Sequence, residues 1–265
     1  MILSKGVRQL TRAERLARIV EKLRIEGSVS VKNLSKEMNV SEPTIRRDLA
    51  EIAENLELPV IRVHGGLILD VQKGGIEPLF EAKLSLMKEQ KQRIAQKALE
   101  FVEDGDSIIL DSGTTALFLA KLLYKKKGLK VITVDIKVAH ELSLSQDIDV
   151  YIVAGQIRNG FYTIGSALAE ASLRQFYADK AFLTADAIDP QLGVMNSSMF
   201  EVGVKRTITE CAKMVILIAD HSKIGKRGLV KVCDLSDVDV FITSKGADPQ
   251  MIETMSRSVS NLIEV

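Results

Sequence analysis

Three observations in the sequence predict an α/β protein made of a small helical unit followed by a larger unit built on a parallel sheet. First, residues 11–55 hold three stretches whose apolar residues recur at helical spacing, and two short strand patterns follow them. Second, helix and strand patterns alternate through residues 79–243. Third, most of those strands are continuous apolar runs, which are typical of parallel strands covered by helices on both faces. A chain of 265 residues can hold both units.

Three helices are expected in the first unit. The first begins near Thr11 and ends at Gly27, which can adopt the left-handed conformation of a C-cap. The second follows Ser30 and the third follows Ser41, because a serine hydroxyl accepts hydrogen bonds from the first turn of a helix. Asn55 can end the third helix. The expected inward residues are apolar and helically spaced: Leu16, Ile19, Val20, Leu23, Val31, Leu34, Met38, Ile45, Leu49 and Ile52.

The segment PVIRVHGGLIL predicts a hairpin around Gly65 and Gly66. Three short helices followed by a hairpin describe a winged helix-turn-helix, which we assign to residues 1–70. The stretch VQKGGIEP, residues 71–78, is expected to be a linker because two glycines and a proline punctuate it. The remaining residues, 79–265, are assigned to the larger α/β domain.

The outer face of the third helix carries residues suited to DNA. Arg47 lies nearly opposite the apolar face, Pro43 shares its side, and Thr44 and Arg46 flank it. Arginine presents a planar fork to guanine or phosphate, and threonine can donate to either, so this face can enter a major groove. Ser41 joins this expected contact set. An arginine pair is more often a solvated surface, but its position in this motif favours DNA binding.

The hairpin adds Arg62 and His64 on alternate positions, where both can reach phosphates, and Gly65 lets the turn approach the backbone closely. Residues 1–69 carry 12 Lys+Arg against 9 Asp+Glu, a net charge of +3, whereas the whole chain has +1. A basic end hints at a polyanionic partner. Asp48 is expected nearer the core than the outer face, where it can support an arginine.

The larger domain contains five further strand patterns after the strand of DSIILDSGTT. They are KVITVD, DVYIVAG, KAFLTAD, MVILIAD and VDVFIT, and the clearest helices are KEQKQRIAQKALEFV and TALFLAKLLYKKK. The strongest chemical pattern is LDSGTTA, residues 110–116, in which a strand runs into a helix. Such a turn presents free backbone N–H groups and hydroxyls to one spot, and the helix dipole favours an anion there. A simple strand-to-helix turn with a threonine cap is the alternative.

Several of these motifs together resemble the DeoR family of bacterial sugar-metabolism repressors. VSEPTIRRDL followed by RVHGG is similar to the DNA-binding signature of that family. LDSGTT resembles the family's phosphate loop, DKAFLTADAID its DKxFxGxxGID segment, and LIADHSK its closing ADxSK. The similarity runs through most of residues 76–243. It implies a sensor domain with a fold like that of ribose-5-phosphate isomerase, and a repressor of a carbohydrate or sugar-acid catabolic operon.

The resemblance implies a small sugar-phosphate-like effector, with Ser112 to Thr115 on its phosphate and with Asp186 and Lys223 lining its sugar side. For Lys223, a surface lysine on a loop is the alternative. The complete expected effector set is Asp111, Ser112, Gly113, Thr114, Thr115, Asp135, Asp186, Lys205 and Lys223.

This sequence departs from the family pattern at several positions. The connection between TIRRDL and RVHGG is about two residues longer than usual. The usual Thr-Asn-Ser becomes Thr-Val-Asp at residues 133–135, the usual Gly-Gly becomes Ala-Gly at 154–155, and Thr-Ala-Asp-Ala stands at 184–187. A carboxylate at Asp135 would repel a second anion. A sugar acid or its phosphate therefore requires a cation beside Asp135, and Arg158 and Lys205 are the candidates.

An enzyme is the first alternative, because isomerases share the expected fold. An isomerase needs a positioned carboxylate base, but in GVMNSSMFEVGVKR the base position is occupied by Lys205 and the isomerase lysine by Asn196. Glu201 lies one turn away and could substitute. The patterns GxSxG, GxxxxGK[ST] and HExxH are absent from the sequence, and its three histidines lack metal-ligand spacing. No catalytic residue, metal or cofactor is expected. A DNA-binding protein that senses nothing is a second alternative, against which LDSGTT argues.

The expected setting is the bacterial cytoplasm, without a membrane partner. No apolar run approaches the roughly 18 residues of a membrane span, and the N-terminus lacks a signal-peptide pattern. Cys211 and Cys233 are not in a CxxC pair and are expected to be buried, inert thiols. The expected partners are double-stranded operator DNA, the small effector and further copies of the chain, as a homodimer or homotetramer. Whether the effector releases or tightens DNA binding is left open.

Overall fold

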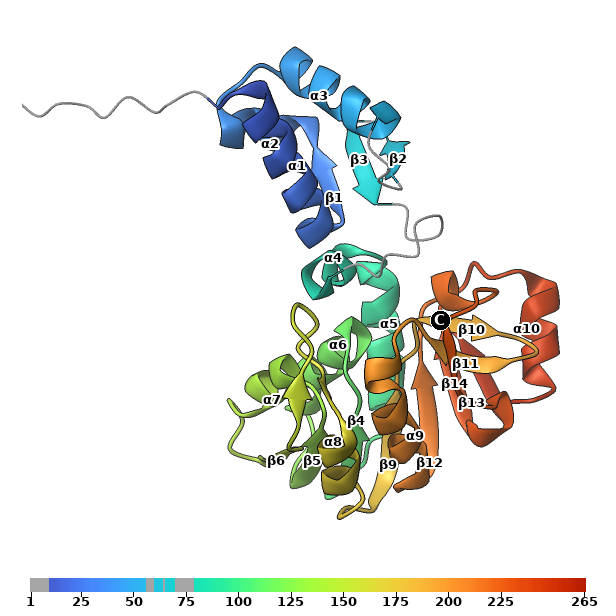
Figure 1. Cartoon of the computed structure of the whole chain (residues 1–265). Coiled ribbons are helices and arrows are strands. Elements are labelled where there is room, and N and C mark those ends of the chain that lie inside the picture. The colour runs from blue at the N-terminus through green and yellow to red at the C-terminus, as the bar shows by residue number, and fades with distance from the viewer. Residues whose placement is uncertain (1–9, 56–59, 64, 70–78) are drawn as a thin grey trace, which may run out of the picture. The chain divides into compact units, whose positions relative to one another are not determined.

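The structure is a computed structural model that describes residues 10–55, 60–63, 65–69 and 79–265. It forms two compact units, Met1–Leu86 and Met87–Val265, which we call the N-terminal and C-terminal units (Figure 1). The expected linker, residues 71–78, lies outside the described residues.

The N-terminal unit contains the three expected helices, α1 (Arg12–Glu26), α2 (Val31–Met38) and α3 (Glu42–Asn55). Their caps confirm the sequence analysis: the Thr11 side chain accepts from the Glu14 N–H, Ser30 caps α2, and Gly27 closes α1 in the left-handed region at φ 72°. Eight of the ten predicted inward residues are buried, and Leu16 and Val20 are partly buried against the same core.

A small antiparallel sheet completes this fold. The expected hairpin is formed by β2 (Val60–Val63) and β3 (Gly66–Leu69), and β1 (Ser28–Ser30) pairs with β3 on its other side. The strand β1 was not predicted, because three residues between two helices are too few to show an alternating pattern. A side chain at Gly66 would place its Cβ 2.0 Å from the Val29 carbonyl oxygen, so the close pairing with β1 requires glycine.

One further helix, α4 (Phe80–Ser85), belongs to the N-terminal unit although the sequence analysis assigned it to the larger domain. Phe80 and Ala82 are buried, and α4 packs against α1. A Cβ at Gly27 would lie 2.8 Å from the Cβ of Ala82. The compact boundary therefore falls after Leu86. The physical reason is that the end of α1 provides the surface on which this short helix buries its apolar residues.

The C-terminal unit is built on a seven-stranded parallel sheet with the order β15-β14-β12-β9-β4-β5-β6. In chain order its strands are β4 (Ser107–Leu110), β5 (Leu129–Thr133), β6 (Ile148–Ile152), β9 (Ala178–Leu183), β12 (Ala212–Ile218), β14 (Val240–Thr243) and β15 (Asn261–Glu264). Six of them were expected, and β15 was not. The parallel α/β fold predicted from the apolar runs is thereby confirmed.

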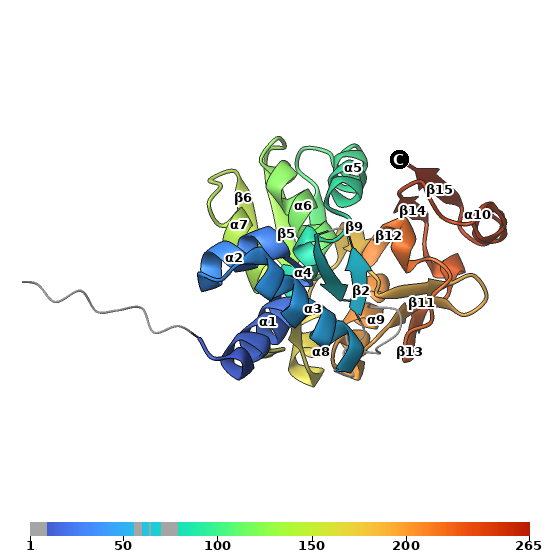
Figure 2. The same ribbon diagram turned by 90° about the horizontal axis from the view of Figure 1, so that it is seen from above.

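Helices cover both faces of this sheet (Figures 1 and 2). One face carries α5 (Lys88–Leu99), α6 (Thr114–Leu123) and α7 (Ile136–Leu142), and the other carries α8 (Ala167–Leu173) and α9 (Val202–Glu210). The helix α10 (Pro249–Ser256) connects β14 to β15. The strand β6 lies at the edge of the sheet, so Tyr151 and Ile152 are 43% and 50% exposed despite their apolar surroundings in the sequence.

Several smaller elements lie in the connections between the strands of this sheet. A hairpin joins β7 (Gln156–Ile157) to β8 (Ile164–Gly165). A second antiparallel sheet contains β10 (Ala187–Asp189), β11 (Gly193–Asn196) and β13 (Val230–Cys233), and three 3-10 helices are η1 (Met199–Glu201), η2 (His221–Lys223) and η3 (Leu235–Asp237). Cys211 and Cys233 are buried free thiols, as expected. Among the described residues, no helix has the length and apolar character needed to cross a membrane.

Candidate DNA interface and effector site

The outer face of α3 presents the predicted residues to solvent. Ser41, Pro43, Arg46 and Arg47 are exposed, and the Ser41 and Thr44 hydroxyls lie 2.9 Å apart. Arg46 donates to Glu42 one turn earlier at 2.8 Å. No described residue forms a hydrogen bond or an ion pair with Arg47. This guanidinium is therefore available to an external partner, whereas Arg46 must exchange an exposed and weak ion pair.

Asp48 holds α3 in place rather than facing DNA. Its carboxylate accepts from Arg15 of α1 at 2.6 and 3.1 Å, and both side chains are almost completely buried. The expectation that Asp48 lies on the core side and supports an arginine is confirmed. Its partner, however, comes from another helix, so the pair sets how α3 is presented.

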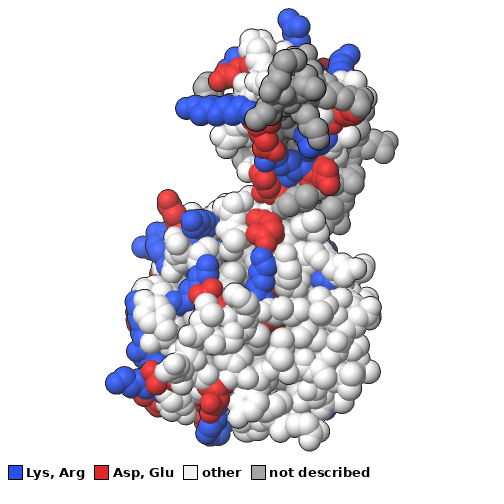
Figure 3. Space-filling view, turned by 90° about the vertical axis from the view of Figure 1, so that its left-hand side faces the viewer, with Lys and Arg blue, Asp and Glu red and all other residues white. Residues whose placement is uncertain are grey.

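The hairpin residues are only partly described. Arg62 is 58% exposed and lies 3.7 Å from Glu54, which is also exposed. Gly65 has a φ of 91°, a conformation that suits glycine. His64 lies outside the described residues. In Figure 3, basic and acidic side chains are interspersed over the visible face of the N-terminal unit.

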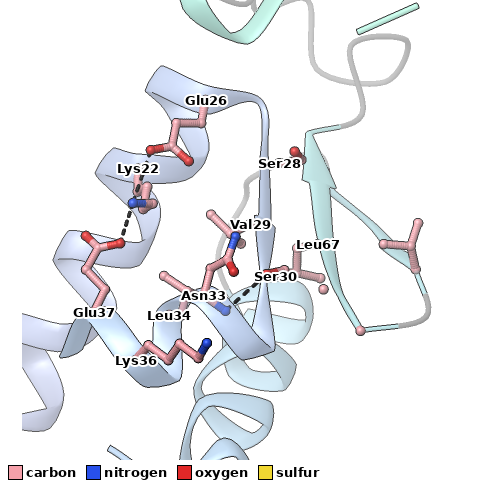
Figure 4. Close-up of a pocket in the computed structure, with 13 residues that line it drawn as sticks. Lys22, Glu26, Ser28, Val29, Ser30, Asn33, Leu34, Lys36, Glu37 and Leu67 are labelled. Atoms are coloured by element: carbon pink, nitrogen blue, oxygen red, sulfur yellow. Dashed lines mark hydrogen bonds and ion pairs between the residues drawn. The ribbon is translucent and has the colours of Figure 1, made fainter. Parts of the chain in front are cut away.

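A hollow of about 750 Å³ lies elsewhere in the same unit, between α1, α2 and the sheet (Figure 4). Lys22 in its wall is bound by Glu26 at 3.1 Å and also by Glu37. Of the predicted DNA contacts that the structure describes, only Gly65 lies in its lining. Because its acidic side chains already neutralise Lys22, the hollow offers less to a polyanion than the outer face of α3 does.

The predicted anion loop lies where β4 leads into α6. Gly113 precedes the helix at φ 120°, in the region that favours glycine. Ser112, Thr114 and Thr115 are each more than nine-tenths buried, yet their hydroxyls have no hydrogen-bond partner among the described residues. Unused hydroxyls beside the free N–H groups of a helix start form a donor set suited to an anion.

A buried ion pair between Lys205 and Asp111 lies next to this loop. The Lys205 Nζ donates to the Asp111 Oδ2 at 2.5 Å and to the Thr184 carbonyl and hydroxyl oxygens at 3.2 and 3.1 Å. Thr184 in turn donates to Asp111 and to the Ser112 carbonyl oxygen. Burial disfavours the charged lysine, but the neighbouring Asp111 and Glu201 carboxylates outweigh it and raise the pKa of Lys205. Lys205 is therefore held as a cation bound to Asp111.

Asp135 is fully buried beneath the same loop. Its Oδ2 accepts from the Gly113 N–H at 3.1 Å, and its Oδ1 accepts from the N–H groups of Lys137 and Val138 at 2.7 and 3.1 Å. Burial is the main cause that raises the pKa of Asp135 to about 6.

Neither cation suggested for Asp135 pairs with it. Arg158 donates to Glu201 at 2.7 Å, and Lys205 is bound to Asp111. The partners of Asp135 are backbone N–H groups, because the carboxylate lies below the loop and at the start of α7, where it caps the helix. Sequence spacing places these charges in one region but does not show which carboxylate each cation meets.

The remaining predicted residues lie at the same edge of the sheet. Asp186 follows β9 and accepts from the Ser197 N–H at 3.1 Å, and Lys223 follows β12 within η2. Both are half-buried. Thr184 was not among the predicted site residues, although its hydroxyl joins Asp111 to the loop. Its position directly after the apolar run KAFL was the available signal, because polar residues that end neighbouring parallel strands meet at one edge.

Isomerase chemistry lacks its base in this site. Lys205 occupies the expected base position, and Glu201, the carboxylate suggested as a substitute, is 7% exposed and paired with Arg158. A carboxylate held by arginine is a weak proton acceptor.

The two units define a class of protein: a transcriptional regulator that joins a helix-turn-helix unit to a sensor unit. Comparison with known proteins agrees. Two family models match, the DeoR-like helix-turn-helix domain over residues 15–73 and the DeoR C terminal sensor domain over residues 87–245. The chain belongs to the DeoR family of transcriptional regulators.

Relatives of similar length support this membership. The glycerol-3-phosphate regulon repressor of Escherichia coli (strain K12) is 32% identical over 229 residues, which cover 85% of this chain and 88% of the relative. The transcriptional repressor AccR of Agrobacterium fabrum is 34% identical over 243 residues, covering 91% and 93%. Ribose 5 phosphate isomerase A from Neisseria gonorrhoeae matches with 22% identity and a TM-score of 0.40, over 53% of this chain and 55% of that one. The relatives identify a regulator rather than an enzyme.

Proposed function

We propose that this regulator represses a carbohydrate catabolic operon in the bacterial cytoplasm and that a small phosphorylated sugar-like effector controls it. The single observation that carries the effector site is the group of unused hydroxyls on Ser112, Thr114 and Thr115 at the start of α6. The name of a relative, the glycerol-3-phosphate regulon repressor, is consistent with a phosphorylated effector. A sugar-acid effector is less favoured, since no described cation pairs with Asp135.

In this proposal a homodimer or homotetramer places two α3 helices in successive major grooves, about one helical turn apart. Arg47 contacts base edges, while Arg46, Thr44 and the hairpin contact phosphates. The effector binds the C-terminal unit and changes DNA affinity only if it binds the two states of the assembly with different affinities. Release of the operator is the expected direction.

Replacement of Arg47 by alanine is expected to weaken specific DNA binding by roughly 1–3 kcal/mol, because the variant loses the proposed contact with a DNA base. Folding should be little affected, because no described residue pairs with the Arg47 guanidinium. Fluorescence anisotropy on the DNA upstream of the protein's own gene measures this. Arg257→Ala removes the same charge from the end of α10 in the other unit, and we expect it to leave binding nearly unchanged. A large drop in melting temperature for Arg47→Ala would show that Arg47 is structural and would contradict this orientation of α3.

Adding a panel of sugar phosphates and sugar acids to the DNA complex tests the effector site. We expect one phosphorylated compound to lower the anisotropy, and Thr114→Val to raise the concentration required by roughly 10- to 100-fold, since a lost hydrogen bond to a charged group costs roughly 1.5–3 kcal/mol. The matched control is Thr254→Val on the exposed surface of α10. An equal response in Thr114→Val and wild type would remove the loop from the effector site.

A further inference from the structure

The Asp135 carboxylate places a negative charge next to the predicted anion site at the start of α6. Its carboxylate lies between the start of α6, where it accepts from Gly113, and the start of α7, where it accepts from Lys137 and Val138. The side chain is completely buried. Helix starts carry partial positive charge that stabilises one nearby anion. A bound effector anion at Thr114 would have to share that potential with Asp135.

The charges around Asp135 leave it without a compensating cation. At the end of β4, Asp111 adds a second negative charge, which is bound to Lys205 of α9. On α7, the Lys137 ammonium lies 4.3 Å from the ring centre of Tyr162.

The hairpin β7–β8 packs against Asp135 through the bridge between Asp135 and Thr163. Arg158, a cation in the turn of this hairpin, is bound to Glu201. Each of the two neighbouring buried carboxylates, Asp111 and Glu201, thus has its own cation, whereas the partners of Asp135 are three backbone N–H groups.

A dianion bound at the start of α6 would therefore lie close to an uncompensated buried carboxylate. Two anions that share a site of low dielectric constant do not both keep their charge, and the weaker acid group takes up a proton. Burial already raises the pKa of Asp135 to about 6, and a second nearby anion that raises this pKa by roughly three further units keeps the carboxyl protonated up to pH 8. A protonated carboxyl still has an oxygen to accept the Gly113 N–H, so the loop can keep its conformation.

We propose that Asp135 makes dianion binding proton-linked: as a dianion binds at the start of α6, one proton passes from solvent to the Asp135 carboxylate. This inference rests on the proposed anion site. Asp135 then determines the affinity of the site for a doubly charged group. Because the protonated carboxyl does not repel the dianion, this affinity is higher at acidic pH.

Sulfate is the probe, because it stays doubly charged between pH 5 and 8 and its own titration does not intrude. Isothermal calorimetry on the full-length protein measures its affinity across this range, and two buffers of different ionisation enthalpy measure proton uptake. For wild type we expect affinity to fall by about tenfold per pH unit above pH 6, and uptake of about one proton at pH 7. For Asp135→Asn we expect a flat pH profile, no uptake, and tighter binding than wild type at pH 8.

Histidine is the other side chain that titrates in this pH range, and the C-terminal unit contains two: His140 on α7, the helix that Asp135 caps, and His221 in η2. His140→Gln and His221→Gln are therefore the matched controls, and each should keep the wild-type slope. Zero proton uptake by wild type overturns the inference without any variant, as does a wild-type slope in folded Asp135→Asn. Sulfate binding by wild type that Thr114→Val weakens would still support the anion site in either case. If sulfate binds neither wild type nor Asp135→Asn at any pH, the anion site and the inference both fail.

Discussion

Replacement of Lys205 by methionine is expected to lower the free energy of unfolding of the C-terminal unit by about 3–5 kcal/mol, because it leaves the buried Asp111 carboxylate without its cation. Lys205 and Asp111 are 2% and 1% exposed, and the Nζ and Oδ2 atoms are 2.5 Å apart. Urea denaturation followed by circular dichroism measures the loss. Asp111 also accepts from the Ser112 and Thr184 N–H groups, so the variant should loosen the anion loop as well.

The matched control is Lys213→Met, which breaks the pair with Asp179 on the surface of the same unit. The Lys213 side chain is 65% exposed, and exposed pairs contribute at most about 1 kcal/mol, so we expect a change below that value. Adding Asp111→Asn to Lys205→Met should recover part of the loss, since the uncompensated charge is then gone. Equal stability losses in Lys205→Met and Lys213→Met would show that the buried pair contributes no more than a surface pair.

Replacement of Asp48 by alanine is expected to destabilise the N-terminal unit by about 3–5 kcal/mol and to abolish operator binding with it. The change leaves the Arg15 guanidinium buried without its carboxylate and removes the pair that fixes α3 against α1. This result differs from that of Arg47→Ala, which should lose DNA affinity at unchanged stability. Thermal unfolding and anisotropy on the same preparations distinguish the two kinds of residue.

Glu51→Ala is the control on the same helix, because Glu51 pairs with Arg12, whose side chain is 69% exposed. We expect its stability to stay within about 1 kcal/mol of wild type. If Asp48→Ala unfolds at the wild-type temperature and still binds the operator, the pair does not position α3.

The DNA-binding half was largely predictable because its determinants are local. Helix caps at Thr11 and Ser30 and the turn at Gly27 depend on residues within one helical turn, and the apolar spacing shows which face is inward. The same geometry put Arg47 outward and Asp48 toward the core. The partner of Asp48 was not predictable, because Arg15 lies 33 residues away in the chain.

In the C-terminal unit, some features could be predicted from short segments and others could not. The parallel sheet followed from apolar runs, and the strand-to-helix turn followed from LDSGTT, since both are properties of short segments. The exposure of β6 did not follow, because an edge strand and a central strand can carry the same apolar run, and the order of strands decides which is which. The short strand β15 was likewise not predictable, because it is defined by its parallel pairing with β14.

The sequence by itself thus determined the two-part architecture, the outward face of α3 and the turn from β4 into α6 at which an anion is predicted to bind. Only the tertiary structure decided that α4 packs with the N-terminal unit, that Lys205 neutralises Asp111, and that Asp135 holds backbone N–H groups without a cation. The physical reason is that caps, turns and helix faces are set by neighbours in the chain. The pairing of buried charges is set by which side chains distant segments bring together, and a sequence pattern records the charges but not their partners.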